Sequence, residues 1–223
     1  MSAHRTLYRW HIWLGWILAI PFMLWTASGL FMVARPIEEV RGEHLRAEAR
    51  AVDTNGLKLP QVTGAVKAMR LANVGGQNVW IVEADKTLSR YDAKSGAPIG
   101  GVDESNARTL ADGYYLGEAR LDAIRRFDAD KAPLDLRKAR PSWQANFSDG
   151  AHVYVDVDTG ELLAIRTKQW RVFDFMWGLH ILDPQTREDT SHPLLIGAAL
   201  LGFASVVIGI VMLVLRQKRK KRV

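Results

Sequence analysis

The side chains of this sequence best suited to holding a metal or carrying a proton near neutral pH are its six histidines: His4, His11, His44, His152, His180 and His192. Four of them (His4, His11, His180 and His192) lie within or beside long apolar segments. Ionisable groups at membrane depth are costly, so they usually face a partner, a cavity or a cofactor. Imidazole is a common axial ligand of haem iron. The pattern therefore favours a cofactor held at apolar segments.

His11 begins a stripe along one helical face. At about 100° per residue, His4, His11, Gly15, Phe22 and Gly29 lie within roughly 40° of one line. Gly15, one turn after His11, would let a flat macrocycle approach the backbone, and Gly29 would make similar room. The alternatives are that the glycines serve helix packing and that the histidine is an interfacial polar residue.

His180 is expected near the opposite edge of the membrane from His11, so one ion in one chain could not bind both. Two copies about a twofold axis would solve this. His11 and its mate would ligate one haem, and His180 would ligate a second with its mate, His44 or His192. Arg9 or Arg171 could pair with haem propionates, because arginine suits carboxylates. The positions of His11 and His180 thus predict two haems at two depths in a homodimer.

Two segments without charged side chains, residues 12–34 and 194–215, are long enough to cross a bilayer as helices. The first apolar segment is too long for a signal peptide, and Thr26-Ala-Ser is a weak cleavage site, so we expect an uncleaved anchor. All 24 acidic residues lie between Arg35 and His192, which leaves the formal charge of +6 to the basic ends. The positive-inside rule then predicts cytoplasmic termini, extracytoplasmic residues 36–193 and no nucleic-acid partner.

The middle of the chain contains a weak repeat. Tyr91-Asp-Ala-Lys-Ser-Gly resembles Val155-Asp-Val-Asp-Thr-Gly, and each reads as a strand followed by a turn that needs glycine. We expect helices over residues 60–72 and 121–127, each packed on an antiparallel sheet. The predicted segments are 1–35 (lead-in and first transmembrane helix), 36–56 (helical connector), 57–115 and 116–168 (the two α+β units), 169–193 (interfacial aromatic helix and connector), and 194–223 (second transmembrane helix and basic tail).

Other kinds of site find little support. Asp156, Asp158 and Glu161 could suggest calcium, but Gly160 is misplaced for an EF-hand loop, and a hairpin turn is the better interpretation. The chain has no cysteine, and it shows no phosphate loop, dinucleotide fingerprint, HExxH motif or nucleophile elbow. The sequence therefore offers no hydrolase site.

Several motifs resemble one known family. His11-x-x-x-Gly15, Ser28-Gly29 and Arg35-Pro-Ile-Glu-Glu resemble the first helix of the PepSY-associated transmembrane family, and the two repeat units resemble PepSY domains. The stretch from Trp170 to Asp183 is similar to that family's segment before its last helix. Large members are inner-membrane reductases of ferric siderophores with haem between four helices, and short two-helix members include dimeric ferric reductases.

The resemblance implies haem b, ligated by His11 and His180, in a bacterial inner-membrane oxidoreductase that reduces free or chelated ferric iron on the periplasmic side. With half the helices of the large members, such a protein must dimerise through its transmembrane helices. It also lacks a flavin or NAD(P)H domain, so its electrons would come from a quinol or a flavoprotein in the same bilayer. PepSY domains in peptidase propeptides suggest the alternative, a non-enzymatic anchored module that inhibits a protease or chaperones a partner.

Overall fold

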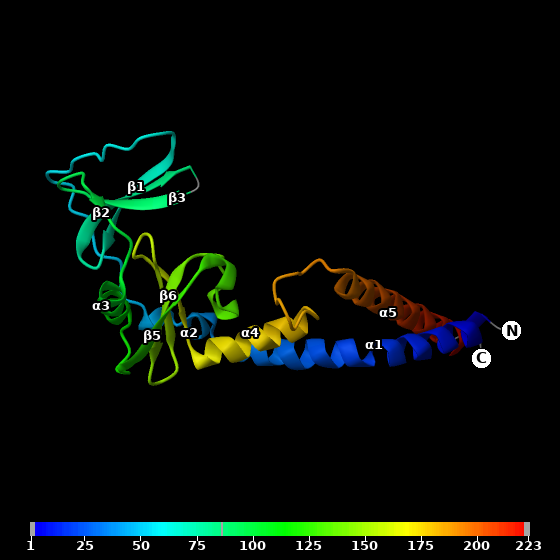
Figure 1. Cartoon of the computed structure of the whole chain (residues 1–223). Coiled ribbons are helices and arrows are strands. Elements are labelled where there is room, and N and C mark those ends of the chain that lie inside the picture. Colours follow the sequence, from blue (N-terminus) through cyan, green and yellow to red (C-terminus); the bar gives the residue numbers. More distant parts are fainter. Residues whose placement is uncertain (1–2, 86, 221–223) are drawn as a thin grey trace. The chain divides into compact units, whose positions relative to one another are not determined.

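A computed structural model describes residues 3–85 and 87–220, except the side chains of residues 3, 4, 219 and 220 (Figure 1). The described residues form two compact units, one within 1–35 and 172–223 and the other over 36–171. The helices are α1 (Ala3–Val33), α2 (Ile37–Arg41), α3 (Glu104–Tyr114), α4 (Lys168–His180) and α5 (Pro193–Lys220), with short 3-10 turns η1 (Glu43–Leu45), η2 (Ala129–Lys131) and η3 (Leu134–Leu136).

The first unit is helical. Residues 5–33 of α1 and 193–218 of α5 are long and apolar enough to cross a membrane, and only 11% and 17% of their most apolar windows are buried inside the protein. A core helix of a soluble protein would be mostly covered. The two predicted transmembrane helices are therefore confirmed. The helices run antiparallel, with the first turns of α1 beside the last turns of α5 (Figure 1).

Small residues of α5 bring the two long helices together. Ala198, Gly202 and Ser205 are buried on one face of α5. A Cβ atom on Gly202 would lie 3.2 Å from the ring of Phe22, so the ring occupies the notch that this glycine leaves. Close backbone approach at small residues is a usual way for helices to associate in a membrane, where no hydrophobic force drives them together.

The second unit contains two antiparallel sheets. The strands are β1 (Val66–Val74), β2 (Gln77–Ala84), β3 (Thr87–Asp92) and β4 (Pro98–Ile99) in the first sheet, and β5 (Leu121–Phe127), β6 (Ser142–Phe147), β7 (His152–Asp156) and β8 (Leu162–Arg166) in the second. Each sheet follows chain order from its first strand to its fourth. The internal repeat read from the sequence is thus a repeat of topology.

The repeated turn has the same hydrogen bonds in both sheets. The Oδ1 atom of Asp92 accepts from the backbone N–H of Lys94 and Ser95, at 3.1 and 2.7 Å. Asp156 Oδ1 accepts from the corresponding N–H groups of residues 158 and 159, both at 2.9 Å. Gly96 and Gly160 close the turns at the same φ of 75°, which favours glycine.

The helices expected over residues 60–72 and 121–127 are wrong, because β1 begins at Val66, residues 60–65 contain no helix, and β5 occupies the second segment. A β-bulge interrupts the register near the start of each strand, between Val66 and Ala68 and between Leu121 and Ala123. The extra residue puts Leu121 and Ile124, three apart, on one face of the sheet. A bulged strand can therefore imitate the three-residue spacing of a helix.

Helix α3 packs against the second sheet, although it precedes that sheet in the chain. It begins at Asp103, whose carboxylate accepts the backbone N–H of Asn106 at 2.8 Å. Ala107 and Ala111 are fully buried, and the core beneath them is formed by Ala145, Phe147, Val153, Val155 and Ile165. The close fit follows from the small alanines on the inner face of the helix.

The connector between α1 and the first sheet is only partly helical. Helix α2 stops at Gly42, whose φ of 67° is left-handed and whose N–H bonds back to the carbonyl of Glu39 at 3.0 Å. After η1 the chain contains no further helix or strand before β1. The helical connector expected over residues 36–56 is therefore limited to α2 and the short turn η1.

Candidate functional site

His180 lies at the end of α4, against the Ser28-Gly29 pair of α1. Its Nδ1 atom is 3.0 Å from the Oγ atom of Ser28, which is 2% exposed. A Cβ atom on Gly29 would lie 3.5 Å from His180 Cε1, an ordinary contact distance, so this glycine borders the imidazole itself. Trp177, one turn earlier on α4, stacks near the same ring at 6.4 Å between ring centres.

The hydrogen bonds of Ser28 determine which imidazole nitrogen carries the proton. A serine hydroxyl has one proton to donate. The Ser28 Oγ atom lies 2.5 Å from the carbonyl oxygen of Leu24, one turn back, and therefore donates to it. Toward His180 it then accepts, an arrangement that matches the tautomer with the proton on Nδ1. In that tautomer the lone pair lies on Nε2, and no hydrogen bond to this atom is present among the described residues.

His11 has a similar setting near the other end of α1. Its Nδ1 atom is 3.3 Å from the Oγ atom of Ser205, which is 5% exposed. A Cβ atom on Gly209, one turn further along α5, would lie 3.3 Å from His11 Cε1. Each of the two histidines thus contacts a buried serine hydroxyl through Nδ1 and borders a glycine of a neighbouring helix.

The two histidine sites are far apart. Ser28, which contacts His180, follows His11 on α1 at a rise equivalent to about 25 Å along the helix. One ion cannot bind both imidazoles of a single chain. No group of three His, Asp or Glu side chains close enough to hold a metal occurs among the described residues.

Gly15 and His192 have different surroundings. A Cβ atom on Gly15 would have no neighbouring atom within 4 Å, so the helix surface one turn from His11 is open. His192 caps the start of α5: its Nε2 donates to the carbonyl of Ile181 at 2.8 Å, and its Nδ1 accepts from the N–H of Leu195 at 3.4 Å. Because both ring nitrogens are used, His192 is a structural cap and a poor second ligand beside His180.

The remaining candidates are dispersed. His44 is exposed on η1 in the other compact unit. The side chain of His4 lies outside the described residues. Arg9 lies two residues before His11, which places it about 160° away around the helix. Arg171 donates to the backbone carbonyls of Arg166 and Gly150, at 3.2 and 2.7 Å, so its guanidinium already has structural partners.

Sequence reasoning did not single out Ser28 as a partner of His180, or Ser205 as a partner of His11. A serine inside an apolar helix is a weak signal, because its hydroxyl can bond to its own backbone. A stronger signal is the small-residue series of α5, in which Ala198, Gly202, Ser205 and Gly209 recur at spacings of four, three and four residues. That series marks the contact face of α5.

The imidazoles of His180 and His11 are suited to be axial ligands of haem iron. A ligating histidine usually binds iron through one nitrogen while the other donates to a fixed acceptor, which sets the tautomer. The geometry at His180 matches this arrangement, because its Nδ1 faces the Ser28 hydroxyl, which donates to Leu24, and its Nε2 has no hydrogen-bond partner among the described residues. The residues at His180 therefore fit a haem. His11 has an equivalent serine and an equivalent glycine beside its ring.

Comparison with family models gives one match, to the family described as the PepSY-associated TM region, over residues 8–223. Comparisons with curated proteins and with solved structures gave no significant match.

Proposed function

Because the chain belongs to the PepSY-associated transmembrane family, we propose that it is a haem-binding electron-transfer protein of the bacterial inner membrane that reduces ferric iron. The observation that carries this proposal is the hydrogen-bond geometry of His180, whose Nδ1 atom lies 3.0 Å from the Ser28 hydroxyl. A half-buried histidine beside a transmembrane helix, with one nitrogen donated to Ser28 and the other available, is prepared to bind a metal.

His180 and His11 would hold the cofactor, haem b, which supplies a one-electron carrier when bound. Two sites at opposite ends of α1 suit transfer between the two membrane surfaces. The donor would be a quinol or a reduced flavoprotein on one side. The acceptor on the other would be ferric iron, free or chelated, which takes one electron and leaves as ferrous iron. The topology proposed is cytoplasmic ends and periplasmic sheets, as the basic ends favour.

Among the described side chains, neither His11 nor His180 has a second imidazole free beside it, since His192 is used as a cap, so a haem held by two histidines would need a second ligand from elsewhere. The proposed source is a second copy of the chain, packed through the transmembrane helices. The open surface at Gly15 and a similarly open one at Gly197 leave room for such an approach. Small residues without a Cβ are common where membrane helices meet.

The first experiment is an absorption spectrum of the full chain, purified in detergent from haem-replete cells and recorded before and after dithionite. The expected result is a low-spin b-type spectrum, with a reduced protein that is reoxidised by a ferric chelate while ferrous iron appears. Protein without a Soret band contradicts the proposal. The anchored binding or regulatory module would then be the better account of the two sheets.

Ser28→Ala tests the proposed role of the serine. Removing the acceptor leaves the Nδ1–H of His180 without a partner, and loss of such a partner typically lowers metal affinity by about 10- to 100-fold. We expect haem to be lost at least tenfold more readily from this variant. Ser28→Thr, which keeps a hydroxyl at the same place, should behave as the natural protein does.

The tautomer itself can be read without haem. In the haem-free full chain labelled with ¹⁵N-histidine, the ring shifts should show His180 protonated on Nδ1, and Ser28→Ala should give a mixture of tautomers. Unchanged ring shifts in Ser28→Ala would contradict the assignment of Ser28 as the acceptor.

A further inference from the structure

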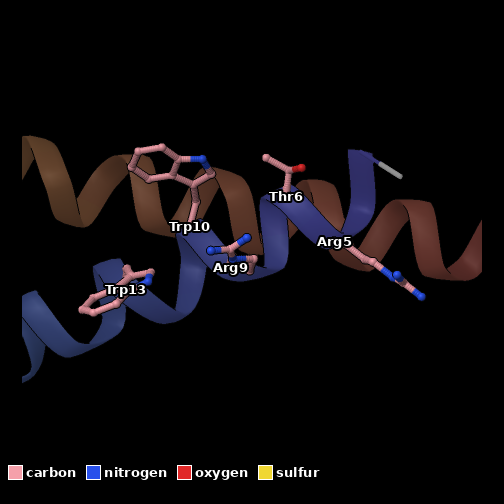
Figure 2. A pocket seen from close by; sticks show the side chains of 5 residues that line it. All are labelled: Arg5, Thr6, Arg9, Trp10 and Trp13. Carbon is pink, nitrogen blue, oxygen red and sulfur yellow. The ribbon is translucent and has the colours of Figure 1, made fainter. Parts of the chain in front are cut away.

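A cavity of about 380 Å³ lies along the first turns of α1, lined by Arg5, Thr6, Arg9, Trp10 and Trp13 (Figure 2). All five residues come from one helix. Their positions lie about 100° to 160° around the axis from His11. None of them is the residue that contacts Ser205 and Gly209 of α5, which is His11.

Both charged side chains that line this cavity are positive. Arg5 and Arg9 are one turn apart and both exposed. Like charges at this spacing on a helix repel each other. Neither guanidinium has an ion pair within the part of the chain that the structure describes, and the first acidic residue of the sequence is Glu38, beyond the far end of α1. An anion placed between the two would remove the repulsion.

The aromatic residues indicate the kind of anion. Trp10 is 61% and Trp13 65% exposed, and Figure 2 shows the two indoles on the first turns of α1 together with Arg9, and Arg5 nearer the N-terminal end. Tryptophans with free surfaces are typical of the boundary between headgroups and acyl chains, where the ring is in contact with lipid and the N–H with a polar group. Arginine binds phosphate oxygens well, and Thr6 adds a hydroxyl donor.

The geometry points to a binding site for the phosphate headgroup of an anionic phospholipid, with Arg5 and Arg9 on the phosphate and the indoles against the glycerol and upper acyl chain. A free phosphate would satisfy the arginines and leave the indole surfaces without a partner. The inference does not depend on haem.

Native mass spectrometry of the delipidated full chain tests this site. Phosphatidylglycerol and phosphatidylcholine, which have a phosphate in common and differ in net charge, are titrated separately. We expect phosphatidylglycerol to bind at least tenfold more tightly, with the preference lost in the double variant Arg5→Gln/Arg9→Gln. Arg35→Gln, at the other end of α1, is the matched control and should keep the preference.

The contrary outcomes are distinct. Equal binding of the two lipids, or an unchanged preference in the double variant, would overturn the proposal. Displacement of bound phosphatidylglycerol by millimolar inorganic phosphate would reassign the cavity to a free anion. Quenching of tryptophan fluorescence by a brominated phosphatidylglycerol, weakened in Trp10→Phe/Trp13→Phe, should locate the bound lipid beside the indoles. If this quenching is equally strong in that double variant, the lipid binds elsewhere.

Discussion

His180→Ala is expected to remove about half of the haem absorbance of the purified protein, and His11→Ala the other half. In the proposed dimer each depth would hold one haem, ligated by two copies of the same histidine, so each substitution would empty one site. The measurement is the pyridine haemochrome content per chain, together with the reduced-minus-oxidised spectrum. The double variant should contain no haem b.

Two other histidines provide matched controls for these substitutions. His44→Ala changes an exposed imidazole of the sheet-bearing unit and should leave the haem content unchanged. His192→Ala removes the cap of α5 and should lower stability without removing a ligand. If His180→Ala folds and keeps its full spectrum while His44→Ala loses haem, the assignment of ligands is wrong. Restoration of the spectrum of His180→Gly by added imidazole would support the assignment.

Asp156→Ala is expected to have the largest effect on the stability of the sheet-bearing unit, about 3 kcal/mol of unfolding free energy. Asp156 is 2% exposed and accepts hydrogen bonds from Arg140 at 2.9 and 2.5 Å. It also accepts the N–H groups of residues 158 and 159 in the repeated turn. Alanine leaves these donors without an acceptor and the guanidinium without its nearest anion.

The equivalent residue of the first sheet provides the control. Asp92 makes the same turn, but its partners are neutral groups on the surface, and hydrogen bonds from Ser95 and Gln77 lower its pKa to about 2. Asp92→Ala should therefore cost much less than Asp156→Ala. Urea-dependent proteolysis of the full chain in detergent measures both losses. Equal losses would show that the turn, rather than the buried pair with Arg140, determines the cost.

Composition and short spacing were enough to predict the membrane helices, the repeated turns and the family. Two uncharged segments are long enough to cross a membrane as helices, in which the backbone satisfies its own hydrogen bonds. The Asp-to-Gly repeat predicted two equivalent turns, because glycine at positive φ and an aspartate accepting nearby N–H groups are local requirements. The family also followed from motifs in order along the chain, and it is confirmed over residues 8–223.

Features that depend on contacts between distant segments could be read only from the folded chain. The bulges in β1 and β5 arise from pairing with neighbouring strands, so three-residue spacing there was misread as helical. The partners of His180 and His11 come from other helices, and Ser28 and Ser205 are far from them in the sequence. A helical wheel gives the direction of a side chain from its own axis. It does not say which neighbouring helix lies in that direction. The serine that each imidazole contacts could therefore not be identified from the sequence.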